Sequence, residues 1–137
     1  MLGFQTTLAA DIKVVKPVAG SLVYKKLLNA IRPRIEYELK TTVRLTVKKM
    51  NMQGNWAYLE VLPLQIDGHA IDYSKTKFKD ANLDLSDPNQ AEMLINYALL
   101  KLVDGRWYEV RQESFQILAN INWGEYFPVK YELFNYE

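Results

Sequence analysis

The sequence predicts an α+β protein in which one N-terminal helix lies across a sheet of four mainly antiparallel strands. Three observations support this fold class. Apolar residues recur at three-and-four spacing over 21–40, the period of one helical face. Apolar and polar residues then alternate over 43–65, and two further strand-like runs flank Asp104-Gly105, a dipeptide typical of hairpin turns. The 137 residues suit one domain of common size, so we expect 1–137 to form a single domain.

The predicted helix spans Ser21 to Lys40, and an extended arm over 1–20 precedes it. Ser21 is the expected N-cap. The apolar stripe consists of Tyr24, Leu27, Leu28, Ile31, Ile35 and Leu39. Pro33 lies inside this segment and removes the hydrogen bond to the carbonyl of Asn29, so we expect one long helix that is kinked there. Two short helices that meet near Arg32 are the alternative.

The first predicted hairpin follows the helix. Its first strand covers 43–52, and the alternation changes phase at Lys48-Lys49, as a β-bulge there would cause. The chain turns at Gln53-Gly54-Asn55, and the second strand runs from Trp56 to Gln65. Pro63 places the end of that strand at an edge or a bulge, because proline cannot donate a hydrogen bond to a neighbouring strand.

The second predicted hairpin joins Leu94 to Val103 with Arg106 to Leu118 through Asp104-Gly105. All four strands belong to an antiparallel meander over 43–118, which contains a long loop over 66–92. A loop of this length is functional, partly structured, or contains an element that the pattern does not reveal.

The C-terminal segment 120–137 is rich in aromatic residues. These are Trp123, Tyr126, Phe127, Tyr131, Phe134 and Tyr136. Because so much aromatic surface is costly to leave in water, we expect the segment to pack back onto the domain.

Composition excludes several function classes. There are 17 Lys and Arg against 16 Asp and Glu, and the resulting charge of +1 supplies no global field for nucleic acid. We therefore expect no nucleic-acid partner. The absence of Cys excludes disulfides, Cys-ligated zinc, Fe–S clusters and thiol nucleophiles. Charges interrupt every run before it reaches the ~18 apolar residues of a membrane-spanning helix, so we expect no transmembrane segment.

The N-terminus has no basic region and no apolar run of signal-peptide length. We therefore expect a cytoplasmic chain, or a periplasmic or exported one from which a leader has been removed.

Four runs carry a resemblance to known proteins: Leu27 to Glu36, Gly54 to Val61, Ile71 to Lys75 and Leu99 to Val110. They look like a group of small bacterial proteins of unknown function that are often exported. A bent helix that leads into a four-stranded meander also resembles the cystatin-like and nuclear transport factor 2-like folds. The likeness covers roughly 21–118. It implies a curled sheet and an exported setting, and it brings no catalytic residues.

The inhibitory motifs of cystatins are not matched. Cystatins bind cysteine proteases through a Gln-x-Val-x-Gly hairpin, a later Pro-Trp loop and an N-terminal Gly. This chain offers only Gln65-Ile66-Asp67-Gly68, whose spacing differs, and it has no Pro-Trp dipeptide. We therefore do not expect protease inhibition.

His69 is the only histidine, which excludes metal sites built from several histidines. It follows Asp67-Gly68 in an expected turn. No Ser or Cys motif accompanies it, so a surface histidine is favoured over a general base.

A partial calcium motif lies in the long loop. Asp80, Asn82, Asp84 and Ser86 occupy the first, third, fifth and seventh positions of a calcium loop. The sixth position is Leu85 where Gly is needed, and the twelfth is Ala91 where an acid is needed. A solvated acidic loop is therefore favoured over a weak calcium site, and we expect no metal and no cofactor.

Charge is distributed unevenly along the chain. Residues 25–49 hold eight basic side chains and two Glu, a local charge of +6, whereas 80–92 carry a local charge of −4. These segments could bind charged partners, or meet within the molecule or across a dimer. The i,i+4 spacing of Arg32 with Glu36 and of Glu36 with Lys40 predicts that much of the basic cluster is a salt-bridged solvent face.

Side chains of the predicted strands provide the ligand-pocket candidates. They are Trp56, Tyr58, Tyr97, Trp107, Tyr108 and Glu109. On a curled sheet such residues could line a concave pocket. Core packing and cross-strand pairing are the alternative for the aromatic ones. An enzyme would also need a carboxylate, and Glu60, Glu109 and Glu113 are the strand acids available.

We therefore expect a non-catalytic binding or interaction module with a protein or small-molecule partner, and a homodimer through the sheet is one arrangement to consider. The alternative is a small-molecule binder or a small enzyme with an aromatic-lined pocket between helix and sheet. The two differ in a checkable way, because an enzyme needs a cavity with a suitable carboxylate inside it.

Overall fold

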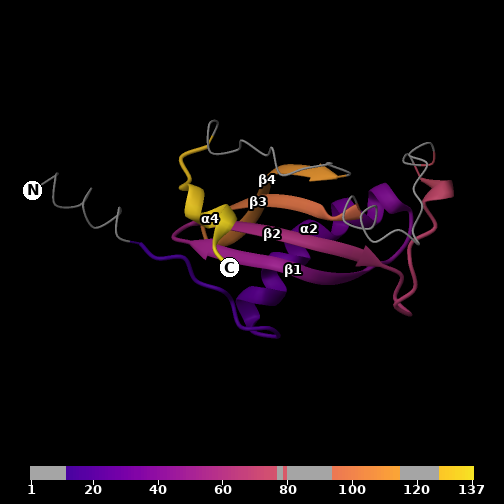
Figure 1. Ribbon diagram of the computed structural model, residues 1–137, viewed down its shortest axis with the longest axis horizontal. Helices are drawn as coiled ribbons and strands as arrows, with labels where there is room; N and C mark the ends of the chain where they lie inside the picture. Colours follow the sequence, from indigo (N-terminus) through magenta and orange to yellow (C-terminus); the bar gives the residue numbers. More distant parts are fainter. Residues whose placement is uncertain (1–11, 77–78, 80–93, 115–126) are drawn as a thin grey trace, which may run out of the picture.

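The computed structural model describes residues 12–76, 79, 94–114 and 127–137. They form helix α2 (Leu22–Leu39), strands β1 (Arg44–Gln53) and β2 (Trp56–Leu64), the 3-10 helix η1 (Tyr73–Lys75), strands β3 (Asn96–Val103) and β4 (Arg106–Ser114), and helix α4 (Tyr131–Asn135). Figure 1 shows α2 on one face of the sheet and α4 on the other. An N-terminal helix followed by a four-stranded antiparallel sheet is the predicted α+β class.

Helix α2 begins at the predicted N-cap. Ser21 Oγ accepts a hydrogen bond from the Tyr24 N–H at 3.4 Å, which satisfies one of the donors left free in the first turn. The helix continues through Pro33, although proline cannot donate to the Asn29 carbonyl. Five residues of the predicted stripe are buried, namely Leu27, Leu28, Ile31, Ile35 and Leu39. This burial on both sides of Pro33 explains why one helix forms, where two were the alternative.

Helix α2 ends at Leu39, because Lys40 adopts the left-handed conformation with φ 57°. Two side chains of the helix form hydrogen bonds with Val43, the residue just before β1. Arg32 Nη1 donates to the Val43 carbonyl at 2.7 Å, and Glu36 Oε2 accepts from the Val43 N–H at 2.9 Å. Val43 is buried, so its backbone polar groups need these partners.

The strands lie in the order β1-β2-β3-β4, each antiparallel to the next. The register between β1 and β2 shifts between Val47 and Lys49, which confirms the predicted bulge. Because of this bulge, Val47 and Met50 both face α2. Val61 is the last residue of β2 that pairs with β3. Pro63 lies beyond this pairing, so β2 is an edge strand there on its β3 side, as the sequence predicts.

The second hairpin has the predicted turn. Asp104 and Gly105 have φ 51° and 77°, and positive values at both central positions identify the type I′ geometry that matches strand twist. β3 begins at Asn96, two residues later than predicted. β4 is described to Ser114, so 115–118 of the predicted strand lie outside the described residues.

The predicted curl of the sheet is wrong, because the sheet is not strongly curled. Both register shifts involve edge strands, one between β1 and β2 and the other between β3 and β4. The central strands β2 and β3 pair from Trp56 to Val61 without a shift. Bulges and glycine kinks are what bend a sheet, and the centre of this one has no bulge.

Both faces of the sheet are buried against helices. Ala57, Leu59 and Val61 of β2 face α2 and complete the main core. Tyr58 faces the other way and forms a second cluster with Leu99 of β3 and Leu133 of α4. Burial on two faces explains why the central strands are nearly continuous runs of apolar residues.

The described part of the predicted arm meets the outer edge of β1 at Val15, and residues 19–20 form a turn before α2. Val15 exchanges two backbone hydrogen bonds with Met52, at 2.7 and 2.8 Å. This pairing covers part of an edge that would otherwise present unpaired backbone groups. In the long loop the structure adds η1, which the sequence pattern did not reveal; Asp72 caps it by accepting from the Ser74 N–H at 3.0 Å.

No helix within the described ranges is long and apolar enough to cross a membrane.

Candidate functional site

The structure divides the six ligand-pocket candidates between the two faces of the sheet. Trp107 packs against the core beneath α2, and Glu109 contacts Arg34 of α2. Trp56, Tyr58 and Tyr97 belong to the cluster beneath α4. Tyr108 lies on the same face as Trp56 and is 48% exposed, opposite Lys101, whose Nζ lies 5.2 Å from the centre of the Trp56 ring. The six residues therefore do not line one pocket.

Glu109 is occupied by a structural ion pair. Arg34 Nε and Nη2 each donate to one of its carboxylate oxygens at 2.8 Å. Arg34 Nη1 also donates to Glu38 at 2.8 Å and to the Asn96 side-chain oxygen at 2.9 Å. Burial by itself lowers the pKa of Arg34, but the hydrogen bonds to Glu109 and Glu38 outweigh it and raise the pKa above its ordinary value. The network thus links α2 to β3 and β4.

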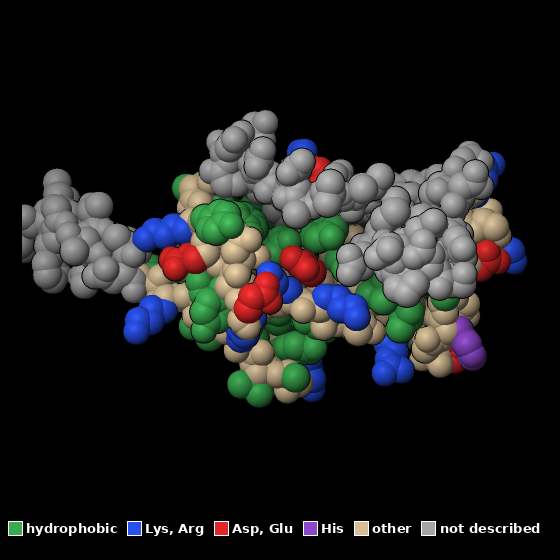
Figure 2. Space-filling view, viewed as in Figure 1, with side chains coloured by type: hydrophobic (Ala, Val, Ile, Leu, Met, Phe, Trp, Pro, Cys, Tyr) green, Lys and Arg blue, Asp and Glu red, His purple; other side chains and the backbone are tan. Residues whose placement is uncertain are grey.

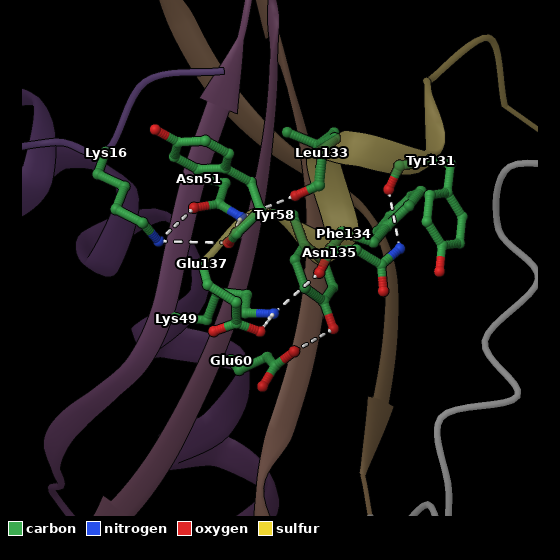
Figure 3. A network of polar contacts seen from close by, with 11 residues as sticks. Lys16, Lys49, Asn51, Tyr58, Glu60, Tyr131, Leu133, Phe134, Asn135 and Glu137 are labelled. Atoms are coloured by element: carbon green, nitrogen blue, oxygen red, sulfur yellow. Dashed lines mark hydrogen bonds and ion pairs between the residues drawn. The ribbon is translucent and has the colours of Figure 1, made fainter.

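The face beneath α4 is built around Asn51 of β1, whose side chain is completely buried. Asn51 Nδ2 donates to the carbonyls of Leu133 and Tyr136, each at 2.9 Å. Asn51 Oδ1 accepts from Lys16 Nζ at 3.0 Å. Figure 3 shows this amide between the arm and the end of α4. One buried side chain therefore joins the arm, the sheet and the C-terminal segment.

Two lysines contact the same end of α4. Lys49 Nζ donates to the Phe134 carbonyl at 3.1 Å and to the Glu137 carboxylate at 3.0 Å. Lys16 Nζ donates to the Tyr136 carbonyl at 3.3 Å and lies 5.2 Å from the centre of the Tyr136 ring. The C-terminal carbonyls of a helix lack partners within the helix and carry partial negative charge, so cations are favourable there.

Apolar contacts fix the same segment. Leu133 is completely buried in the cluster that contains Tyr58 and Leu99. The Phe134 ring stands edge-on to Tyr58 with centroids 5.0 Å apart, and Phe127 lies 6.0 Å from Trp56. For 127–137, the part of the predicted segment 120–137 that the structure describes, these contacts confirm the expected packing onto the domain.

Tyr58 also has a polar role. Its hydroxyl donates to Glu60 Oε2 at 2.7 Å. Burial, together with the negative charge of Glu60, raises the pKa of Tyr58 far above its ordinary value of 10. Tyr58 therefore remains a hydrogen-bond donor at neutral pH, and Glu60 is the strand acid that holds its hydroxyl.

A groove of about 780 Å³ lies between the last turns of α2 and η1. Its lining residues are Glu36, Tyr37, Glu38, Lys40, Ser74, Lys75, Thr76 and Lys79. Glu36 binds the Val43 N–H, and Glu38 binds Arg34. None of the six predicted pocket residues lines this groove.

His69 lies on the surface, with a side chain that is 79% exposed. Its Nδ1 is 2.9 Å from Asp67 Oδ2. The hydrogen bond to Asp67 and its charge raise the pKa of His69, and the same contact lowers the pKa of Asp67. The calcium candidates Asp80, Asn82, Asp84 and Ser86 lie outside the described residues.

The basic residues of 25–49 are dispersed, and the acidic segment 80–92 lies outside the described residues. Lys25 and Lys26 are exposed on α2 and Lys40 is exposed just after it, whereas Lys49 faces α4. Among the described residues of 25–49, an i,i+4 ion pair joins Arg34 and Glu38 at 2.8 Å. Arg32 and Glu36, which the spacing paired, both contact Val43.

Sequence reasoning missed Asn51 as the centre of a buried network. In the sequence pattern Asn51 is only a polar residue between Met50 and Met52. A signal was present in β2 and β3, because near-continuous apolar strands indicate a sheet buried on both faces. With both faces buried, a strand Asn needs partners for its amide.

Comparison with protein families, with curated proteins and with solved structures finds no match for this chain. The structure therefore establishes the α+β class and the sheet topology, while membership of a cystatin-like or nuclear transport factor 2-like group stays an expectation.

Proposed function

We propose that the protein is a non-catalytic interaction module whose binding surface is the sheet face that carries α4. The supporting observation is the way this face holds the segment 127–137. Asn51, Lys16 and Lys49 donate to three backbone carbonyls at the end of a short helix, and Leu133 fills the apolar cluster. Backbone contacts supply affinity and a buried side chain supplies selectivity, which is the general logic of peptide recognition.

The ionisable groups support a role without catalysis. Both oxygens of Glu109 are bound by Arg34, Glu60 accepts from the Tyr58 hydroxyl, and His69 is paired with Asp67 in solvent. A general base needs an oxygen or nitrogen that can reach a substrate proton. Glu109, the acid among the predicted pocket residues, has both oxygens bound by Arg34 and lies in the scaffold.

The proposal is tested by measuring peptide binding to the sheet face beneath α4 after the resident segment 127–137 has been displaced from it. In the 137-residue chain, Leu133→Ala with Phe134→Ala removes the apolar anchors of the resident segment and leaves the sheet unchanged. A fluorescent peptide with the native sequence 127–137 is then titrated by anisotropy. We expect the variant to bind it more tightly than the unmodified chain, in which the tethered segment competes at an effective concentration on the order of millimolar.

Two controls make the test specific. A peptide carrying Leu133→Ala lacks the buried anchor, and a chain that also carries Asn51→Ala lacks the central amide. Both should weaken binding about tenfold or more, because each removes a buried contact. The proposal fails if the emptied chain keeps its far-ultraviolet circular dichroism but binds the native peptide no better than the unmodified chain does.

The groove between α2 and η1 favours a second candidate function, binding of a small molecule. Its volume of about 780 Å³ suits a small ligand, and Lys75 and Ser74 supply polar groups at its wall. Ligand-observed NMR with a mixture of small organic acids and amines tests it. Saturation transfer that Lys75→Ala abolishes and Lys48→Ala leaves intact supports this function, and no transfer to any compound removes it.

A further inference from the structure

The connection between the arm and α2 is a rigid, exposed turn. The Ser21 N–H donates to the Val18 carbonyl at 3.0 Å, and Gly20 between them has φ 81°. A positive φ at the third residue of a turn is the geometry that glycine allows most readily. Val18 is 75% exposed and Leu22 is 69% exposed, although both are aliphatic. The fold thus holds two large apolar side chains in solvent on a fixed backbone.

The charge around this turn has one sign. Residues 12–35 contain no Asp or Glu, and the basic residues nearest to the turn in sequence are Lys13, Lys16, Lys25 and Lys26, whereas Arg32 and Arg34 lie about 15 to 18 Å further along α2. Lys16 and Arg34 have partners within the chain. Lys25 and Lys26 are exposed and make no side-chain hydrogen bond or ion pair with the described part of the chain. The near-neutral net charge therefore conceals a local positive end.

We propose that this end, which we call the apolar tip (residues 18–22 with Lys25 and Lys26), docks the protein on an anionic lipid bilayer. Helical rise places Lys25 and Lys26 about 5 to 6 Å along the axis from Leu22. The headgroup layer on each side of a bilayer is about 5 to 7 Å thick. When α2 points at the membrane, Leu22 and Val18 enter the acyl boundary while the two lysines lie among the headgroups.

Shape and charge favour a lipid surface over a protein partner. Figure 2 shows hydrophobic side chains at the lower edge of the molecule, where Figure 1 places the turn before α2. A projecting turn with two aliphatic side chains is small beside the 1,200 Å² or so that a stable protein interface buries in total. Apolar insertion combined with lysines at the surface is sufficient for reversible attachment to anionic lipids.

Co-sedimentation of the 137-residue chain with vesicles tests the proposal. One set of vesicles is phosphatidylcholine alone, and the other contains equal parts of phosphatidylcholine and phosphatidylserine. We expect binding to the second set to exceed binding to the first about 25-fold, since each of the two lysines contributes roughly fivefold near an anionic surface. Added salt should reduce the difference, because it screens exposed charges.

Matched variants distinguish binding through the apolar tip from non-specific adsorption to the vesicles. Leu22→Gln should lower the partition coefficient between vesicle and water about tenfold, because it removes a leucine side chain from the apolar phase. Ile66→Ser is the control, since Ile66 is 61% exposed and lies outside the tip, and it should leave the partition coefficient unchanged. Lys25→Gln with Lys26→Gln should abolish the preference for phosphatidylserine, and Lys48→Gln should retain it. Equal binding to both vesicle types, no binding to either, or equal effects of Leu22→Gln and Ile66→Ser would overturn the proposal. The absence of binding to either vesicle type would favour a protein partner for the tip, whereas equal effects of the two substitutions would indicate non-specific adsorption.

Discussion

Arg34 of α2 and Glu109 of β4 form a two-pronged ion pair in which Nε and Nη2 each donate to a separate carboxylate oxygen at 2.8 Å. Their side chains are 22% and 13% exposed, so water screens the pair only in part. Helix α2 lies on the face of the sheet, and this contact fixes its position relative to the edge strand. A carboxylate that the sequence offers for binding or catalysis is thereby part of the scaffold.

Glu109→Gln should destabilise the protein by about 1 to 3 kcal/mol, because it leaves the partly buried Arg34 guanidinium with Glu38 as its remaining carboxylate partner. Glu137→Gln is the matched control, since this carboxylate, which pairs with Lys49 at 3.0 Å, is 86% exposed, and it should cost less than about 0.5 kcal/mol. Urea unfolding followed by circular dichroism measures both. Equal effects of the two substitutions would contradict a structural role for Glu109.

Asn51→Ala should loosen α4 without unfolding the sheet. The substitution leaves the Leu133 and Tyr136 carbonyls without the amide that binds them, at a cost of about 1 to 3 kcal/mol. Backbone amides of 131–136 should therefore exchange with deuterium faster, while those of β2 and β3 stay protected. Asn29→Ala, on the exposed side of α2, is the control and should leave exchange in α4 unchanged. Unchanged exchange in Asn51→Ala would show that apolar contacts alone hold the segment.

The parts of the fold that the sequence predicts depend on neighbouring residues. Ser21 caps a helix through a bond to Tyr24, the bulge at Lys48 restores the apolar phase within one strand, and Asp104-Gly105 sets its own turn. Each of these features follows from the conformational preference of a few adjacent residues. The curl of the sheet was predicted wrongly because it depends on where bulges lie across all four strands.

The candidate site depends on residues far apart in the chain, which is why less of it could be predicted. Arg34 and Glu109 are separated by 75 residues, and Asn51 and Leu133 by 82. The period at which apolar residues recur shows which face of a strand or helix is apolar. It does not show which distant side chain covers that face. Thus the aromatic residues of the strands were recognised, whereas their division between two faces required the topology.

Lys40→Gly should stabilise the protein by about 0.5 to 1 kcal/mol. Lys40 ends α2 in the left-handed conformation, which strains a residue with a Cβ and which glycine adopts freely. Lys26→Gly is the matched control, because the same replacement within the helix should cost about 1 kcal/mol. Thermal unfolding should therefore give a higher Tm for the first variant and a lower Tm for the second. A fall in Tm for Lys40→Gly would mean that its side chain makes a stabilising contact.

His69 should titrate above its ordinary pKa of 6.5, because Asp67 stabilises the charged imidazole. As the chain has one histidine, a single imidazole resonance followed by proton NMR gives this pKa directly. Because the pKa of His69 is raised in the folded state, its pairing with Asp67 adds to the free energy of unfolding. This contribution is fully present below pH 6.5, and it is lost as pH rises through the pKa of His69 in the folded protein. The pKa of Asp67 is lowered from 3.8 in the folded state. The contribution of Asp67 is therefore fully present above pH 3.8, and it is lost as pH falls through the pKa of Asp67 in the folded protein.

Asp67→Asn provides the control for this titration, because it removes the negative charge and keeps a side chain of similar size. The pKa of His69 should then fall back toward 6.5. Both groups are exposed, so we expect the titration to shift while thermal stability hardly changes. A pKa that is the same in the two proteins would show that the contact between His69 and Asp67 does not persist in solution, and His69 would then be a solvated surface histidine without a partner.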